Sequence, residues 1–245
     1  MIERFEINGV PVEAEYAQTD VQSIFLPLLR EIVRKKTEIS GRMLVFLAAP
    51  PAAGKSTLAA FWAYLAELTP DLPQMQALGM DGFHYHADYI SEHTVMRDGQ
   101  CIPMTRIKGA PESFDVQKLH ETLRAIQQGE CVRFPMYDRR KHDVVEEAVE
   151  VNAPILLIEG NWLLLDEPIW RELPHDYSIF INAPEKMLRE RVLWRRQCTG
   201  RTKAEAETLW RECDGPNVQR CLMHRTQADV QLQLHENGLY TRNEG

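Results

Sequence analysis

One continuous segment, residues 43–68, constrains the fold of this 245-residue chain more than any other. It opens with the wholly apolar run Met43–Ala48, which is typical of a strand buried on both faces of a parallel sheet. It closes with residues 57–68, where Leu58, Phe61, Trp62 and Leu65 share one face of a predicted helix. Between them lies A-P-P-A-A-G-K-S-T. The succession predicts a strand, a phosphate-binding loop and a helix.

The loop pattern has Ala49 where its first glycine usually stands. Backbone N–H groups around Gly54 would surround the β-phosphate, helped by the positive end of the following helix. Lys55 would reach the β- and γ-phosphates, and Ser56 would hold Mg²⁺. A bare Gly-Lys-Ser often arises by chance, so the flanking strand and helix carry the prediction of ATP binding. The candidate ATP-binding residues are Ala49, Pro50, Pro51, Ala52, Ala53, Gly54, Lys55, Ser56 and Thr57.

The rest of the chain alternates apolar runs with amphipathic segments. Four further strands are expected, one ending near Met80-Asp81 and three at 154–158, 177–181 and 230–234. Helices are expected at 21–36, after Asp115, at 184–199, and from a Thr202/Glu205 capping box to a stop before Gly215-Pro216. Strands separated by helices predict an α/β fold, a P-loop NTPase three-layer sandwich with a mainly parallel central sheet and a helical lid.

The two ends of the chain each carry a turn signal. Asn8-Gly9 predicts an N-terminal β-hairpin within 5–16, and Asn237-Gly238 predicts a final hairpin turn. Residues 82–112 are polar and unusually long for a connection, which indicates a substrate-binding insertion. We therefore expect a hairpin and helix over 1–40, a kinase domain over 41–236 with its lid region at 186–213, and a C-terminal tail over 237–245.

Composition limits the classes of partner. The net charge of -8 argues against a general nucleic-acid binder. No apolar run approaches the roughly 20 residues that a membrane-spanning helix needs, and the charged N-terminus is unlike a signal peptide. The five cysteines are irregularly spaced without a C-x-x-C motif, so we expect reduced thiols in or near the core rather than a metal site. These features predict a cytoplasmic protein without nucleic-acid or membrane partners.

Two acidic residues follow predicted strands, at the edge where open α/β sheets bind ligands. Asp81 could accept the proton of an attacking hydroxyl as a phosphoryl group transfers, although an Asp before a Gly is often only a turn residue. Glu159 could hold a magnesium-bound water, although a strand-end acid is often merely solvated. Each interpretation depends on the neighbouring phosphate-binding loop.

An arginine-rich helix is predicted after these acids. Arg189 and Arg196 share one helical face, as do Arg191 and Arg195. Such a helix near the γ-phosphate could neutralise the charge of the transition state. The alternative is a solvated charged face, which is the usual meaning of a charge run.

These elements together resemble one family of P-loop kinases. Asp81-Gly82-Phe83 resembles the T-D-G-F segment of bacterial pantothenate kinase, and residues 108–115 resemble its K-G-F-P-E-S-Y-D segment. Residues 135–138 with His142 are similar to the P-x-Y-D…H segment of uridine kinases, and residues 191–201 match the arginine-bearing lid. Over about residues 43–234 the chain resembles the superfamily of pantothenate kinase, uridine kinase and phosphoribulokinase. It looks closest to a bacterial branch that includes sugar kinase-like proteins.

The resemblance implies particular roles. Asp81 becomes the catalytic base, assisted by Lys55, Arg191 and Arg195, with Ser56 and Glu159 at the metal. It also implies a set of substrate-binding candidates: Lys108, Tyr137, Arg139 and His142. Tyr137 and His142 could equally be packed residues. The N-terminal hairpin and the short chain after the lid depart from a full pantothenate kinase, so the resemblance does not identify pantothenate as the substrate.

The expected activity is ATP- and Mg²⁺-dependent phosphorylation of a hydroxyl on a small molecule, such as a sugar, a nucleoside or a pantothenate-like compound. The alternative is a regulatory P-loop protein that hydrolyses ATP without such an acceptor. A nucleotide acceptor stays open, because the insertion holds only Arg97, Arg106 and Lys108 as basic residues. Asn217, in a turn expected at 214–217, is a candidate adenine contact. The N-terminal hairpin could form a homodimer interface or cap the sheet.

Overall fold

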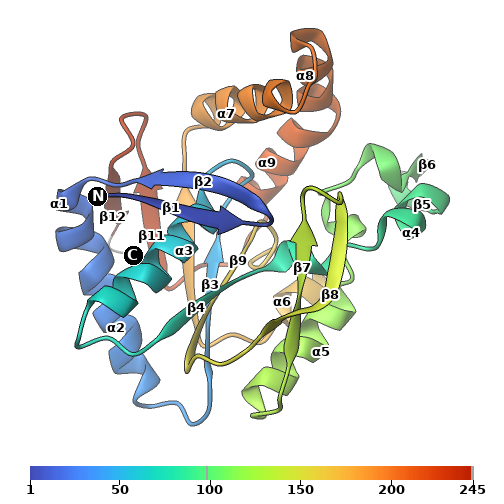
Figure 1. The fold of residues 1–245 in the computed structure, drawn as a ribbon. Coiled ribbons are helices and arrows are strands. Elements are labelled where there is room, and N and C mark those ends of the chain that lie inside the picture. The colour runs from blue at the N-terminus through green and yellow to red at the C-terminus, as the bar shows by residue number, and fades with distance from the viewer. Residues whose placement is uncertain (98, 244–245) are drawn as a thin grey trace.

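A computed structural model describes residues 1–97 and 99–243 of the chain. Its largest sheet has six strands in the order β12-β11-β10-β3-β9-β4 (Figure 1). Neighbouring strands are parallel except β11 and β12, which are antiparallel. The strands are β3 (Met43–Ala48), β4 (Met75–Gly79), β9 (Ile155–Gly160), β10 (Tyr177–Asn182), β11 (Val230–Leu234) and β12 (Tyr240–Asn243). The predicted α/β fold with a mainly parallel sheet is confirmed.

Helices cover both faces of this sheet. On one face lie α3 (Lys55–Leu68) and a continuous helix made of α1 (Gln18–Asp20), a π-helical turn and α2 (Leu26–Lys36). On the other face lie α5 (Val116–Gln127) and α6 (Pro168–Arg171). The strand that precedes the phosphate-binding loop is buried along its whole length, as its composition predicts.

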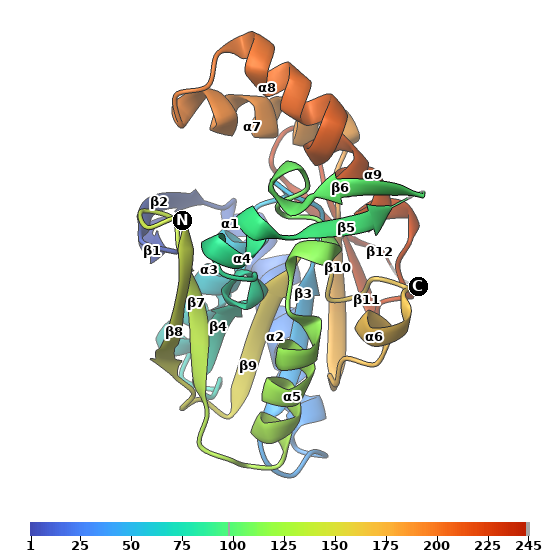
Figure 2. The same ribbon diagram turned by 90° about the vertical axis from the view of Figure 1, so that its right-hand side faces the viewer.

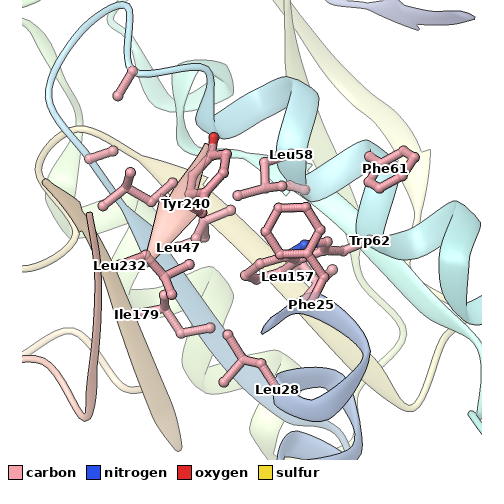
Figure 3. Close-up of a cluster of buried hydrophobic side chains, with 14 of the residues drawn as sticks. Phe25, Leu28, Leu47, Leu58, Phe61, Trp62, Leu157, Ile179, Leu232 and Tyr240 are labelled. Atoms are coloured by element: carbon pink, nitrogen blue, oxygen red, sulfur yellow. The ribbon is translucent and has the colours of Figure 1, made fainter. Parts of the chain in front are cut away.

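The larger core lies between α2, α3 and the sheet (Figure 3). Phe25 and Trp62 approach each other with ring centroids 5.7 Å apart, in the edge-to-face arrangement that aromatic pairs favour. The side chains of the sheet interleave with them from four different strands: Leu47, Leu157, Ile179 and Leu232. This packing fixes α3 against β3, and so it fixes the loop between them.

The N-terminal hairpin, β1 (Ile2–Ile7) and β2 (Val10–Glu15), forms around Asn8-Gly9 as predicted. Both turn residues have positive φ, 53° and 77°, which is the conformation that this dipeptide supplies in two-residue hairpin turns. The hairpin packs on α3, where the Tyr64 hydroxyl donates to Glu3 Oε1 at 3.1 Å. It also reaches the site region, because the Arg139 backbone N–H donates to the Asn8 carbonyl.

Residues 82–112, the long polar segment expected as a substrate-binding insertion, contain regular structure that the sequence did not predict. They contain α4 (Ala87–Glu92) and a hairpin of β5 (Thr94–Arg97) and β6 (Gln100–Pro103). A second unpredicted hairpin, β7 (Arg133–Asp138) and β8 (Asp143–Glu150), stands beside the main sheet (Figure 2). The first hairpin is mostly exposed, so its strands carry no strong apolar alternation. The second contains an irregular register, and Glu147 has a φ of 48°.

The arginine-rich segment forms α7 (Glu185–Cys198), which projects with α8 (Lys203–Leu209) above the carboxyl ends of the strands (Figure 1). The Thr202/Glu205 capping box is present. The expected stop before Gly215-Pro216 is wrong, because a π-helical turn leads directly into α9 (Gly215–Met223). In that turn the Gly215 N–H donates to the Trp210 carbonyl, and the wider turn lets a proline follow within the helix.

The segment 237–245, expected to be a C-terminal tail, instead contributes β12 to the main sheet after the predicted Asn237-Gly238 turn. Residues 244–245 of this segment lie outside the described part. All five cysteines are free, with Cys213 and Cys221 buried and the other three exposed, so only two pack in the core. No helix among the described residues is both long and apolar enough to cross a bilayer.

Candidate active site

The phosphate-binding loop runs from the end of β3 to the start of α3. Ala49 is fully buried, and its N–H donates to the Gly160 carbonyl at 3.3 Å, which ties the loop to the neighbouring strand. Ala52 and Gly54 have positive φ, 66° and 87°, so the chain curls before the helix begins at Lys55. The Ala-for-Gly departure at position 49 is therefore accommodated as a buried alanine. The first N–H groups of a helix have no partner within it, so those at the start of α3 would be available to an anion.

The two predicted acids lie side by side with this loop. Glu159 occupies β9, between β3 and β4, and its register partners are Leu47 and Gly79. A side chain at Gly79 would come within 3.1 Å of Glu159 Oε1, so the glycine leaves room for the carboxylate. Asp81 follows β4 directly, in a 3₁₀ turn over Met80–Phe83. Both carboxylates therefore stand at the carboxyl edge of the sheet, as predicted.

The surroundings of the two acids shift their pKa values in opposite directions. Burial acts to raise the pKa of Asp81, but the positive charges of His84, Arg139, Lys55 and Arg195 outweigh it, and the pKa lies below its usual value. An ionised Asp81 can accept a proton. Burial raises the pKa of Glu159, and the charge of Asp81 adds to the rise, while Lys55 and a hydrogen bond with the Ser56 side chain oppose it.

The residues proposed for Mg²⁺ fit that ion. Ser56 and Glu159 offer a hydroxyl and a carboxylate that are close enough for Ser56 to lower the pKa of Glu159, and Mg²⁺ prefers such oxygen donors. The buried Glu159 carboxylate is only partly compensated by Lys55, as its raised pKa indicates. A divalent cation at this position would supply the missing positive charge.

The structure divides the arginine run of α7 into two pairs. Arg191 Nη1 donates to the Ala52 carbonyl at 3.4 Å, and the guanidinium of Arg195 lies close enough to Asp81 for their charges to interact. These two residues face the phosphate-binding loop and the acids. Arg189 instead pairs with Glu207 at 2.6 Å, and Arg196 pairs with Asp214 at 2.8 Å, so these two hold the lid together.

Of the four substrate-binding candidates, Arg139 lies near Asp81, and Lys108 and Tyr137 lie near His84. Arg139 Nη2 lies 3.7 Å from Asp81 Oδ2. Lys108 Nζ lies 5.2 Å from the centre of the Tyr137 ring and donates to the His142 carbonyl at 3.3 Å. His142 contributes that carbonyl through a backbone with a φ of 54°, and its side chain is exposed. Their binding of a substrate stays a prediction.

Sequence reasoning missed His84. Its Nδ1–H donates to the Asp81 carbonyl at 2.9 Å, and its ring lies 5.4 Å from that of Tyr137 and 3.8 Å from that of Phe114. Burial lowers the pKa of His84, while the charge and the carbonyl of Asp81 act in the opposite direction. The sequence feature that could have indicated His84 as a site residue is its position directly after Asp81-Gly82-Phe83.

The expected turn at 214–217 is wrong, because these residues lie in the helix that continues into α9. Asn217 is buried, and its amide group donates to Cys213 Sγ at 3.7 Å. Its contact with adenine stays a prediction. The helix continues because Gly215 allows the π-helical turn to pack closely. A side chain there would come within 2.8 Å of the Trp210 carbonyl oxygen.

A buried strand, a phosphate-binding loop, two strand-end acids and lid arginines together define a P-loop kinase site. Comparison with known proteins gives the family. The model of the phosphoribulokinase/uridine kinase family matches residues 44–206. The chain belongs to this family, and it is a P-loop kinase.

Individual relatives agree with this assignment. The uncharacterised protein YggC of Escherichia coli strain K12 is 45% identical over 237 residues, which cover 96% of both chains. The pantothenate kinase of Vibrio cholerae is 27% identical and covers 87% of this chain and 80% of its own length. Among solved structures, a candidate fructose transport system kinase from Silicibacter sp. TM1040 has a TM-score of 0.74 at 29% identity, covering 84% of this chain and 98% of that one.

Proposed function

We propose that this kinase transfers the γ-phosphoryl group of ATP to a hydroxyl of a small molecule such as a sugar, a nucleoside or a pantothenate-like compound. The observation that carries the proposal is the ionised Asp81 carboxylate beside the phosphate-binding loop, held at a lowered pKa among cationic groups. A hydroxyl acceptor needs a group that takes its proton as the new O–P bond forms. An ionised carboxylate in this position is suited to that role.

The neighbouring residues would support the same step. Lys55, at the start of α3, would balance charge on the β- and γ-phosphates, and Arg195 would face the oxygens of the transferring group. Ser56 and Glu159 would hold Mg²⁺, which when bound would neutralise charge on the phosphates. The proposed chemistry is therefore positioning and electrostatic stabilisation, with one proton passing to Asp81.

The lid would close the site. Arg191 already touches the loop through the Ala52 carbonyl, so α7 is anchored at one point beside the phosphates. Closure of α7 and α8 over bound ATP would bring Arg195 closer and exclude water, which competes with the acceptor hydroxyl. The names of the relatives do not identify the substrate, because one is a pantothenate kinase and another is a candidate kinase of a fructose transport system.

An acceptor screen tests the proposal. ADP release would be measured with Mg²⁺-ATP against sugars, amino sugars, sugar acids, nucleosides and pantothenate, with Asp81→Asn in parallel. The proposal expects a large rise in ADP with at least one compound and loss of that rise in the variant. A slow ADP release that no compound stimulates would contradict it and would favour an ATPase without a small-molecule acceptor.

A further inference from the structure

A cavity of about 360 Å³ lies next to His84, and it is lined by none of the residues assigned above to ATP, Mg²⁺ or the acceptor hydroxyl. Its walls come from residues 83–93, from the start of α5 and from β8. The volume lies in the range of small-molecule sites, and it is large enough for one monosaccharide unit. The walls are held together, because the Ala87 N–H at the start of α4 donates to Asp143 Oδ1 of β8 at 3.1 Å.

One wall of this cavity is a stack of rings. Tyr85 and Tyr89 lie 4.4 Å apart at an interplanar angle of 26°, and Tyr89 and His93 lie 3.6 Å apart at 11°. The Tyr89 ring is therefore held between two others, which fixes its orientation. Aromatic side chains offer apolar area together with polar edges, a combination suited to a flat ligand that also carries hydroxyl groups.

The polar part of the lining holds more carboxylates than ammonium groups. Four carboxylates line the cavity, those of Asp88, Glu92, Asp115 and Glu146, together with one ammonium group, that of Lys118, and the imidazole rings of His84, His86 and His93. Lys118 is already paired with Glu146 at 2.5 Å. Within the described residues, neither Asp88 nor Glu92 takes part in an ion pair. An anionic group entering here would meet uncompensated negative charge, whereas hydroxyl and ammonium groups would find acceptors.

His84 connects this cavity to the proposed reaction centre. It lines the cavity, and its Nδ1–H donates to the carbonyl of Asp81. The cationic candidates Lys108 and Arg139 do not line the cavity. A ligand seated against the ring stack could therefore extend a hydroxyl past His84 toward Asp81, while the positive charges remain on the side of the phosphates.

We propose that this cavity binds the part of the acceptor remote from the reacting hydroxyl, and that it selects a neutral sugar or an amino sugar over a sugar acid. The inference rests on the proposed function, because the cavity is assigned to the acceptor of that reaction. Because Tyr85 and His93 cover the two faces of the Tyr89 ring, the edge of that ring would contact the sugar. Asp88 and Glu92 would accept hydrogen bonds from hydroxyl or ammonium groups and would repel a carboxylate.

Matched sugars test this selection. The probes are two trios, D-glucose with D-glucosamine and D-glucuronate, and D-galactose with D-galactosamine and D-galacturonate, together with nucleosides and pantothenate. Within an active trio we expect kcat/KM for the neutral or amino sugar to exceed that for the acid about tenfold, the combined effect of two exposed and partly screened carboxylates. The double variant Asp88→Asn/Glu92→Gln should reduce this ratio by about threefold or more, mainly by improving turnover of the acid.

The control variant is Glu38→Gln, which removes an exposed carboxylate from the turn after α2 and should leave the ratio unchanged. Tyr89→Leu should raise KM for the active sugar with a smaller effect on kcat. The inference would be overturned, and the proposed function left intact, if sugar acids were phosphorylated as well as their neutral partners. The same holds if the double variant left the ratio of the kcat/KM values unchanged. Turnover restricted to nucleosides or pantothenate would also overturn the inference and leave the proposed function intact. If no compound is phosphorylated, the proposed function and the inference both fail.

Discussion

The guanidinium of Arg139 lies 3.7 Å from the carboxylate of Asp81, although the two residues come from different parts of the chain. Arg139 follows β7, in a hairpin that the sequence did not reveal, and Asp81 follows β4 of the main sheet. The charge of Arg139 is one of the causes that lower the pKa of Asp81. His84 lowers this pKa more than Arg139 does, and Lys55 and Arg195 lower it less. The hairpin therefore tunes the proposed base from outside the sheet.

Removal of this contact should shift the pH dependence of the reaction. Without the charge of Arg139, the pKa of Asp81 should rise, because the raising effect of burial remains. A base acts in its ionised form, so activity is lost as pH falls through its pKa. We therefore expect the acidic limb of the kcat/KM profile to move to higher pH in Arg139→Met. Lys141→Met, on the same exposed turn, is the control and should keep the wild-type limb. An unmoved limb in Arg139→Met would exclude this electrostatic role.

Glu159→Gln should weaken the binding of Mg²⁺ without destabilising the fold. Because burial raises the pKa of Glu159 in the folded protein, ionisation of this residue lowers the free energy of unfolding. This destabilisation is absent below the pKa of the unfolded state, and it grows as pH rises through the pKa of the folded state. At neutral pH and without Mg²⁺, the Tm of the variant should equal or exceed that of the wild type. The Mg²⁺ concentration for half-maximal activity should rise about tenfold. A lower Tm with unchanged Mg²⁺ dependence would assign Glu159 a structural role instead.

The division of the lid arginines predicts two different phenotypes. Arg195→Met should lower kcat by about 10²-fold, as loss of a transition-state donor does, with little change in Tm. Arg196→Met leaves the buried Asp214 carboxylate without its partner and should cost about 1–2 kcal/mol, less than for a fully buried pair because Arg196 is 34% exposed. Steady-state kinetics gives kcat, and thermal unfolding gives Tm, for both variants. Equal effects on kcat and Tm in both variants would contradict the division.

Gly82 holds the turn of Asp81 against β7. A side chain there would come within 2.2 Å of the Pro135 carbonyl oxygen, which is backbone and cannot turn aside. Gly82→Ala should therefore destabilise the fold by about 1–3 kcal/mol. Gly160→Ala is the comparison variant, because the atoms nearest to its new methyl group belong to the side chain of Met80 rather than to backbone. Chemical denaturation should show the larger loss in Gly82→Ala, and the reverse order would refute the packing explanation.

Local sequence signals predicted the elements that carry the proposed chemistry. The phosphate-binding loop, the two strand-end acids and the Thr202/Glu205 capping box all depend on short, contiguous patterns with a fixed physical meaning. Asn8-Gly9 is a further case, because both of its residues take the positive φ that the turn requires. Such features are set within a few residues, so tertiary context does not alter them.

Features that depend on distant partners could not be predicted in the same way. Nothing in the helical spacing of Arg195 and Arg196 shows that only Arg196 meets Asp214. Likewise, Gly215-Pro216 ordinarily ends a helix, and only packing against Trp210 sustains the π-helical turn through it. The β7–β8 hairpin was not predicted, because its irregular register breaks the alternation of apolar and polar residues that marks a regular strand. The role of His84 could not be read from its spacing either, because its ring is placed by contacts with Phe114 and Tyr137 of distant segments.

The most direct test of the kinase assignment is single-turnover phosphorylation of the acceptor by Asp81→Asn, with ATP binding and Tm measured on the same preparation. If Asp81 is the base, the phosphoryl-transfer rate should fall by about 10²–10⁴-fold, while ATP affinity and Tm stay close to those of the wild type. A variant that transfers phosphoryl groups at nearly the wild-type rate would show that Asp81 is only a turn residue, and the proposed mechanism would be wrong.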